Sequence, residues 1–131
     1  MSGYGAKAYK QTSVATASRG QVLIMLYEGA IQNIKKAIVC IEMKDLSGKG
    51  KYIIKTHDII NELNTSLNFE LGGKVAEDFQ RLYNFMTDQL LKANMESSKE
   101  KLQTVQKLME TLLEGWRVAV SEFQKNGTSL K

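Results

Sequence analysis

Apolar residues recur every three or four positions along most of this chain, which is the spacing that places side chains on one face of an α-helix. The first series follows Ser18-Arg19-Gly20-Gln21, whose Ser-x-x-Gln form is typical of a helix-capping box. Its members are Leu23, Leu26, Tyr27, Ala30, Ile34, Ala37, Ile38 and Ile41. We therefore predict a first helix over residues 19–43.

A second series begins after the turn-forming stretch from Lys44 to Gly50, in which Asp45 or Ser47 is placed to cap the next helix. Its apolar stripe is Ile53, Thr56, Ile60, Leu63 and Leu67. Gly72-Gly73 follows, and glycine readily takes the left-handed conformation that closes helices. These signals predict a second helix over residues 47–70.

Two further stripes occupy the rest of the chain. The third is Val75, Phe79, Leu82, Met86, Leu90 and Ala93, and the fourth is Leu102, Val105, Met109, Leu112, Trp116, Ala119 and Phe123. Between them, Ser97-Ser98-Lys99-Glu100 has the form of a second capping box. We predict helices over residues 74–94 and 98–124.

Four amphipathic helices joined by short links pack most simply as an antiparallel four-helix bundle, because a short link forces its two helices to run in opposite directions. The chain has 131 residues, the size of one domain, and it contains no proline. We therefore predict an all-α fold with the bundle over residues 18–125. Residues 1–17, which lack a helical stripe, form an extended or short helical cap segment, and residues 126–131 form a tail.

Charge and cysteine content narrow the partners and the compartment. The net charge is +4, but the basic residues are dispersed and have acidic neighbours, which is weak support for nucleic-acid binding. Steering of an acidic partner stays open. A single cysteine, Cys40, and the absence of a signal sequence or a long apolar run predict a cytoplasmic protein that does not insert into membranes.

The sequence also lacks the residue sets of the common helical-bundle cofactor sites. His57 is the only histidine, whereas di-iron bundles need two Glu-x-x-His motifs, and Cys40 alone does not complete a zinc site. No Gly-x-Ser-x-Gly elbow accompanies His57, and Gly72-Gly73 lacks the spacing of a phosphate-binding loop. We predict no metal, no cofactor and no catalytic residue, so the protein is not expected to be an enzyme.

Several apolar residues fall outside the predicted stripes. Ile54 lies off the second stripe, Phe85 and Leu91 lie off the third, and the first helix has a larger set: Val22, Ile24, Met25, Ile31 and Val39. A helix that is apolar nearly all round needs cover on more than one side. A central place in the bundle, the folded-back N-terminal segment and a bound partner each supply such cover.

The order of short motifs resembles a known family. Residues 8–18, Ala-Tyr-Lys-Gln-Thr-Ser-Val-Ala-Thr-Ala-Ser, lead into Leu-Ile-Met-Leu-Tyr-Glu-Gly-Ala-Ile at 23–31. Ile-Ile-Asn-Glu-Leu at 59–63, Leu-Asn-Phe-Glu-Leu-Gly-Gly at 67–73, Leu-Tyr-Asn-Phe-Met at 82–86, Ala93-Asn94 and Trp116 follow. From residue 4 to residue 123 this order resembles the FliS family of flagellin-specific secretion chaperones. Arg19 departs from the family, which typically has proline there.

The resemblance implies a protein that binds the C-terminal helical segment of flagellin, prevents its premature polymerisation and assists its delivery to the flagellar type III export gate. It also implies that Tyr9 and Val14 shield the bundle when flagellin is absent. With the leftover apolar residues, the predicted partner-binding set is Tyr9, Val14, Ile24, Ile31, Ile54, Phe85 and Leu91. We expect a monomer or weak homodimer; the alternatives are an adaptor or regulator for another amphipathic helix and, less simply, a nucleic-acid binder.

Overall fold

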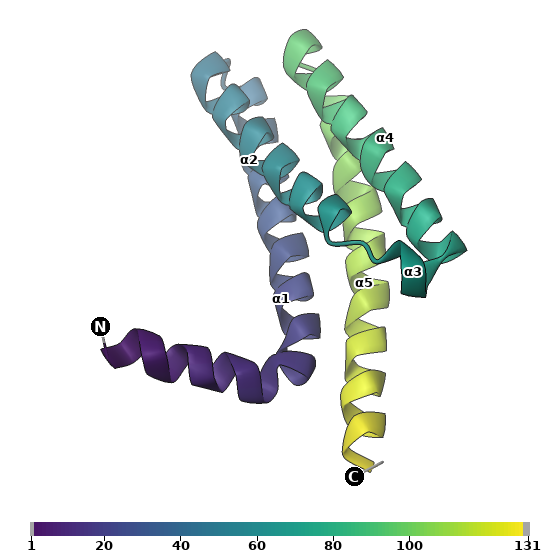
Figure 1. Cartoon of the computed structure of the whole chain (residues 1–131). Coiled ribbons are helices and arrows are strands. Elements are labelled where there is room, and N and C mark those ends of the chain that lie inside the picture. The colour runs from purple at the N-terminus through teal and green to yellow at the C-terminus, as the bar shows by residue number, and fades with distance from the viewer. Residues whose placement is uncertain (1, 130–131) are drawn as a thin grey trace.

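Helices joined by short turns make up the described chain. The computed structural model describes the backbone of residues 2–129 and the side chains of residues 19–69, 72–123 and 125. Its elements are α1 (Ser2–Glu42), α2 (Leu46–Thr65), α3 (Phe69–Gly72), α4 (Lys74–Glu96) and α5 (Lys99–Ser129). The four long helices run alternately up and down, and the single turn α3 lies between α2 and α4 (Figure 1).

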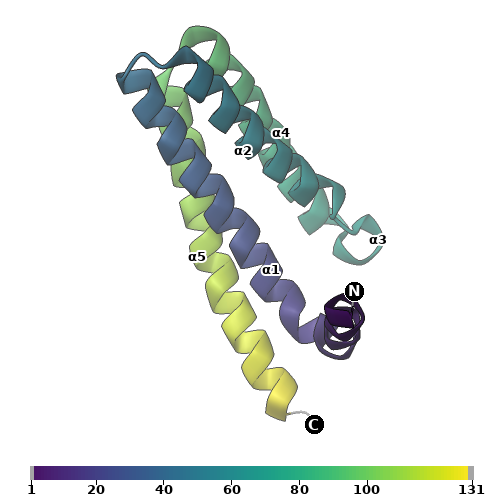
Figure 2. The same cartoon turned by 90° about the vertical axis from the view of Figure 1, so that its left-hand side faces the viewer.

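The long helices form a closed ring of neighbours around one core. α1 packs against α2 and α5, and α4 packs against the same two helices from the other side (Figure 2). The core members are Tyr27, Ala30, Ile31, Ile34, Ala37, Ile53, Ile60, Leu63, Tyr83, Met86, Leu90, Ala93, Leu102, Val105, Met109 and Leu113. This arrangement confirms the predicted all-α, antiparallel four-helix bundle.

The first and last helices are longer than predicted. α1 begins at Ser2 rather than near Arg19, and α5 continues to Ser129. The first seventeen residues contain no proline, the strongest helix breaker, and their alanines, lysines and glutamine favour a helix, whereas Gly3 and Gly5 weaken that preference. The separation of residues 1–17 and 126–131 from the bundle as a cap segment and a tail stays a prediction.

The second helix is shorter than predicted because polar side chains close it early. α2 ends at Thr65, not near Gly72. The hydroxyls of Thr65 and Ser66 donate to the carbonyls of Glu62 and Leu63, and the Ser66 amide also bonds back to Glu62. Such local bonds compete with helix continuation. The predicted tail of this helix is instead a turn followed by α3.

The predicted caps are partly right. Asp45 caps α2 by accepting a hydrogen bond from the amide of Gly48 at 3.0 Å, as predicted. At the α4–α5 turn, Ser98 rather than Ser97 caps α5, since its hydroxyl accepts from the amide of Lys101. Ser97 has a φ of 51° and is the left-handed residue that ends α4.

The helices differ in length, and this leaves one end of the bundle half covered. α2 has 20 residues and α5 has 31, so their lengths are about 30 Å and about 46 Å. α1 and α5 therefore extend together past the ends of α2 and α4 (Figures 1 and 2). Within the described residues, no helix is both long and apolar enough to cross a membrane.

Candidate partner-binding surface

The first exposed apolar pair lies along the seam where α2 packs against α4. Antiparallel packing sets the register there, because Asn64 donates a hydrogen bond to Asn84 at 3.0 Å and Gly50 lies beside Asn94. This register puts Ile54 of α2 nearly level with Leu91 of α4. Their side chains are 58% and 54% exposed, so the outer edge of the seam presents two aliphatic side chains to solvent.

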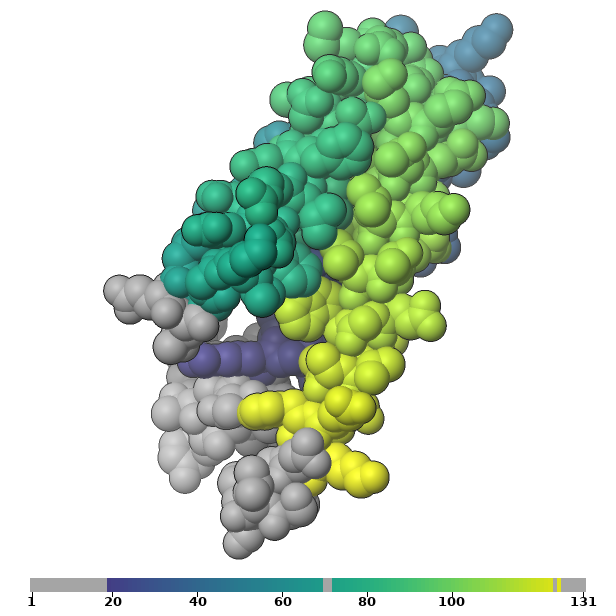
Figure 3. Space-filling view, turned by 90° about the vertical axis from the view of Figure 1, so that its right-hand side faces the viewer, coloured from purple at the N-terminus to yellow at the C-terminus, as the bar shows by residue number. Residues whose placement is uncertain are grey.

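A second exposed apolar position lies on the seam between α4 and α5. The rings of Phe79 and Trp116 lie 5.4 Å apart, and Lys101 forms an ion pair with Glu96, so α4 and α5 are antiparallel neighbours along this face (Figure 3). Phe85 projects on the α5 side of α4 and is 44% exposed. The half-buried apolar residues of the same two helices include Leu82, Leu108 and Leu112. Together they form an apolar strip with an aromatic ring at its edge.

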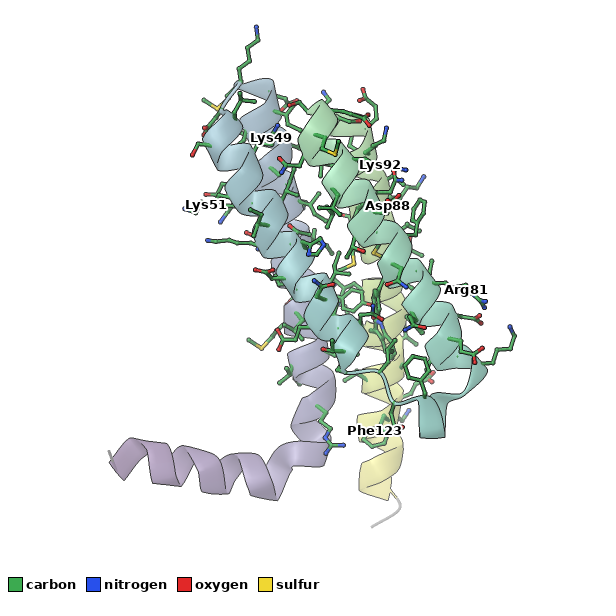
Figure 4. The ribbon with its side chains drawn as sticks, turned by 45° about the horizontal axis from the view of Figure 1, so that its top comes forward. Lys49, Lys51, Arg81, Asp88, Lys92 and Phe123 are labelled. Atoms are coloured by element: carbon green, nitrogen blue, oxygen red, sulfur yellow. The ribbon has the colours of Figure 1, made fainter. Side chains whose placement is uncertain are left out.

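The open end of the bundle contains a third apolar feature. A depression of about 470 Å³ lies between α1 and α5, lined by Arg19, Gly20, Leu23, Trp116, Ala119, Val120 and Phe123. Gly20 permits close approach of the two helices, since a Cβ atom there would lie 2.7 Å from Cγ2 of Val120. Phe123 is 57% exposed at this end (Figure 4). We call this feature the open-end depression.

Beneath the seams, two tyrosines share a buried hydrogen bond. The hydroxyls of Tyr27 on α1 and Tyr83 on α4 lie 2.6 Å apart, and either can donate. Burial raises the pKa of both phenols. The hydrogen bond to Tyr83 partly offsets this rise in the pKa of Tyr27, whereas Tyr27 raises the pKa of Tyr83 further. The indole nitrogen of Trp116 is buried nearby without a hydrogen bond of normal geometry. These aromatic side chains lie between the α4–α5 seam and the open-end depression, which Trp116 also lines.

The predicted site residues divide into three groups. Ile54, Phe85 and Leu91 are exposed, as predicted for residues off the core stripes, and Ile24 is half-buried against the core. Ile31 is only 6% exposed and belongs to the core, so its predicted place off the core face is wrong. It faces α5, and the wide contact between α1 and α5 extends the buried face of α1. The side chains of Tyr9 and Val14 lie outside the described residues.

Sequence reasoning missed the open-end depression. Leu23, Ala119 and Phe123 were assigned to core stripes, but at this level α2 and α4 no longer supply cover, so Phe123 is exposed. Val75, assigned to the third stripe, is likewise exposed in the first turn of α4. The lengths of the stripes do not reveal the difference, because the first stripe (residues 23–41) and the third stripe (residues 75–93) span the same number of residues.

The two candidates for catalytic or metal-binding chemistry, His57 and Cys40, both contact neighbouring side chains. His57 is half-buried, and its Nδ1 atom lies 3.1 Å from the side-chain amide nitrogen of Asn61. Cys40 is buried. Burial raises the pKa of its thiol, and the nearby carboxylate of Asp45 raises this pKa further. Among the described residues, no group of three or more histidine, cysteine or acidic side chains is arranged to hold a metal ion.

The structure is thus a four-helix bundle with apolar side chains exposed on two seams and at one open end, and such surfaces are typical of helical binding proteins. The family model described as flagellar protein FliS matches residues 2–122. The chain belongs to the FliS family, whose matched relatives are flagellar secretion chaperones.

Individual relatives support this assignment over nearly the full chain. The flagellar secretion chaperone FliS of Salmonella typhimurium strain LT2 is 34% identical over 118 residues, covering 86% of this chain and 87% of the relative. That of Bacillus subtilis strain 168 is 31% identical over 119 residues, covering 91% and 88%. A crystal structure of a bacterial flagellar chaperone shares the fold, with a TM-score of 0.77 at 18% identity, covering 93% of this chain and 99% of that one.

Proposed function

We propose that this protein binds the C-terminal helical segment of flagellin in the cytoplasm, prevents its polymerisation before export, and assists its delivery to the flagellar type III export apparatus. Family membership supports a role in flagellar secretion. A chaperone role implies binding rather than catalysis, and the proposal needs no cofactor, metal or nucleic acid.

The exposed apolar side chains are the observation that carries the proposal. Ile54 and Leu91 mark the α2–α4 seam, Phe85 marks the α4–α5 seam, and Phe123 marks the open-end depression. One rigid helix does not reach all three places, because they lie on different sides and at different heights of the bundle. A segment that is disordered when free and helical when bound can lay a short apolar face on each in turn.

This mode of binding sets the expected size of the interface. Coupled folding and binding typically buries on the order of 1,000–3,000 Å², and ordering the segment consumes part of the favourable free energy. Ile24 is the further proposed contact on α1, where it is half-buried. Tyr9 and Val14 remain proposed shields of the same surface in the absence of flagellin, and Ile31 supports the surface from the core.

Calorimetric titration with a peptide spanning the last forty or so residues of flagellin from the same organism tests the proposal. We expect tight one-to-one binding and a parallel gain of helix by circular dichroism. A peptide of the same composition in scrambled order is the control. Absence of binding at high micromolar peptide would contradict the flagellin assignment and favour an adaptor or regulator for another amphipathic helix.

A further inference from the structure

Three lysine side chains from two helices converge on one aromatic ring. The ammonium groups of Lys36 on α1 and of Lys51 and Lys55 on α2 lie 5.5, 5.5 and 5.7 Å from the ring centroid of Tyr52. Lys36 is distant from the other two in the chain, so the packing of α1 on α2 creates the cluster. The ring attracts each cation, but three like charges around one ring also repel one another.

No carboxylate forms an ion pair with this cluster within the part of the chain whose side chains are described. Elsewhere the exposed lysines often have acidic partners, as Lys92 has in Asp88 at 3.1 Å and Lys99 has in Glu42 at 3.3 Å. None of the three lysines around Tyr52 forms such an ion pair among the described side chains. The free protein therefore presents a concentrated positive charge whose repulsion an anionic partner would relieve.

A shallow depression of about 410 Å³ adjoins the lysines. Its lining is Lys35, Lys36, Val39, Cys40, Asp45 and Tyr52. Val39, Cys40 and the Tyr52 ring make part of it apolar, and Lys35 is a further lysine in its lining. We call the depression and the lysines around it the Tyr52 surface.

The Tyr52 surface is separate from the apolar surface described above. It lies where α1 packs on α2, a contact marked by the approach of Gly48 to Cys40 and of Gly29 to Ile59. In Figure 4, Lys51 points outward from α2 on the side away from α4. A segment bound at the α2–α4 seam, the α4–α5 seam or the open-end depression would leave this side of the bundle accessible.

We propose that the Tyr52 surface is a second binding site, which takes an acidic segment of a partner protein. Two or three carboxylates of the segment pair with Lys36, Lys51 and Lys55, and one apolar side chain between them enters the depression beside Val39. Flexible lysine stems adjust to carboxylates at helical spacing. Because the charges are exposed, the site chiefly increases the association rate and selects acidic partners, and salt weakens it.

Three features favour a protein segment over nucleic acid. Three ammonium groups already lie over the ring of Tyr52, so a base would have to displace them to stack on it. Asp45 lines the same depression and would repel a phosphate chain, whereas a segment that mixes acidic and apolar side chains can place an apolar one there. The cluster also spans only about one turn of each helix, too short to follow a nucleic-acid backbone.

A pair of synthetic helices tests the proposal by fluorescence anisotropy. One labelled peptide carries three glutamates around a leucine on a single face, and its control carries glutamines in their place. The protein variant Lys36→Gln/Lys51→Gln/Lys55→Gln removes the cluster. The variant Lys74→Gln/Lys92→Gln/Lys107→Gln removes the same charge from exposed positions elsewhere and is the matched control.

We expect the glutamate helix to bind about tenfold or more tightly than the glutamine helix at low salt. The cluster variant should lose that preference, while the control variant changes affinity by less than about twofold. Both variants should bind the flagellin peptide like the parent protein, because the two surfaces are separate; this readout also keeps a failure here distinguishable from a failure of the chaperone proposal.

Other outcomes overturn the second site. Undetectable binding of the glutamate helix, or an equal loss in both lysine variants, would mean that the cluster has no special role. Tighter binding of a short DNA duplex, abolished only in the cluster variant, would assign the surface to nucleic acid. If the cluster variant no longer bound the flagellin peptide, the Tyr52 surface would be part of the flagellin-binding site.

Discussion

Lys49 of α2 donates a hydrogen bond to the carbonyl oxygen of Asn94 in the last turns of the neighbouring helix α4, at 2.8 Å. Its ammonium group also donates to the Ser97 hydroxyl at 2.8 Å, and the residue is only 7% exposed. A helix C-terminus has unsatisfied carbonyls and partial negative charge, so it stabilises a cation without a carboxylate. The lysine thereby joins α2 to the end of α4.

Replacement of Lys49 by methionine should lower the free energy of unfolding by about 1–3 kcal/mol. The new side chain fills similar space but leaves the Asn94 carbonyl without its partner. Urea denaturation followed by circular dichroism measures the change. Lys51→Met, at an exposed neighbouring position, is the control and should shift stability by less than about 0.5 kcal/mol; equal effects would contradict the bridging role.

The tyrosine pair should show strong coupling in a double-mutant cycle. Tyr27→Phe or Tyr83→Phe alone leaves one buried hydroxyl without its 2.6 Å partner and should cost about 1–3 kcal/mol. The double variant removes both hydroxyls and should cost clearly less than the sum of the two single changes. Additive costs in denaturant unfolding would show that the hydroxyls do not depend on each other.

The same pair should make the protein sensitive to alkali. Burial holds the folded-state pKa of Tyr27 and of Tyr83 above the usual value of 10.0, so the folded state retains protons that the unfolded state releases. Stability from these groups is complete below pH 10.0 and is lost as pH rises toward the folded-state pKa values. Unfolding free energies measured across this range should fall less steeply in the Tyr27→Phe/Tyr83→Phe variant than in the parent.

Acidic substitutions on the seams should weaken flagellin binding without unfolding the protein. Ile54→Asp or Phe85→Asp should reduce affinity for the flagellin peptide about tenfold or more, since each removes apolar contact worth about 1.5–3 kcal/mol when fully buried. Met43→Asp is the control, because Met43 is 75% exposed in the turn between α1 and α2 and is not one of the proposed contacts. A variant that binds normally with an unchanged helical spectrum would remove its residue from the site.

Two helical glycines should respond differently to alanine. Gly115 has no atom within 4 Å of a built Cβ, so Gly115→Ala should stabilise the protein by about 0.5–1 kcal/mol through helix propensity. At Gly20 the same gain is offset by overpacking against Val120, at about 1–3 kcal/mol. The midpoint temperature of thermal unfolding should therefore rise for Gly115→Ala only. Adding Val120→Ala to Gly20→Ala should restore the midpoint that the glycine substitution lowers.

The periodic pattern was sufficient to predict the bundle and most of its core. Tyr27, Ile60, Met86 and Met109 all lie on predicted stripes and are buried, because in a bundle each helix buries mainly one face. The same rule correctly left Ile54, Phe85 and Leu91 outside the core. Helix ends were predicted less well, since they depend on single hydrogen bonds such as those that close α2 at Thr65.

Features that depend on pairing between helices were not visible in the pattern. Phe123 has core spacing but lacks an opposing helix, and Ile31 has surface spacing but faces α5. The convergence of Lys36 with Lys51 and Lys55 likewise depends on how α1 packs on α2. To predict each of these features, the relative position of two helices must be known, and the spacing of residues within one helix does not determine it.

The unequal helix lengths also affect how the fold opens. Around Met109, α5 is surrounded by neighbours on its buried side, whereas around Phe123 it has lost α4 and keeps only α1. Local stability follows the density of buried contacts, so the last turns of α5 exchange their amide protons through smaller and more frequent openings than its middle. Opening of the fold is therefore expected to be cooperative at the closed end of the bundle and more local at the open end.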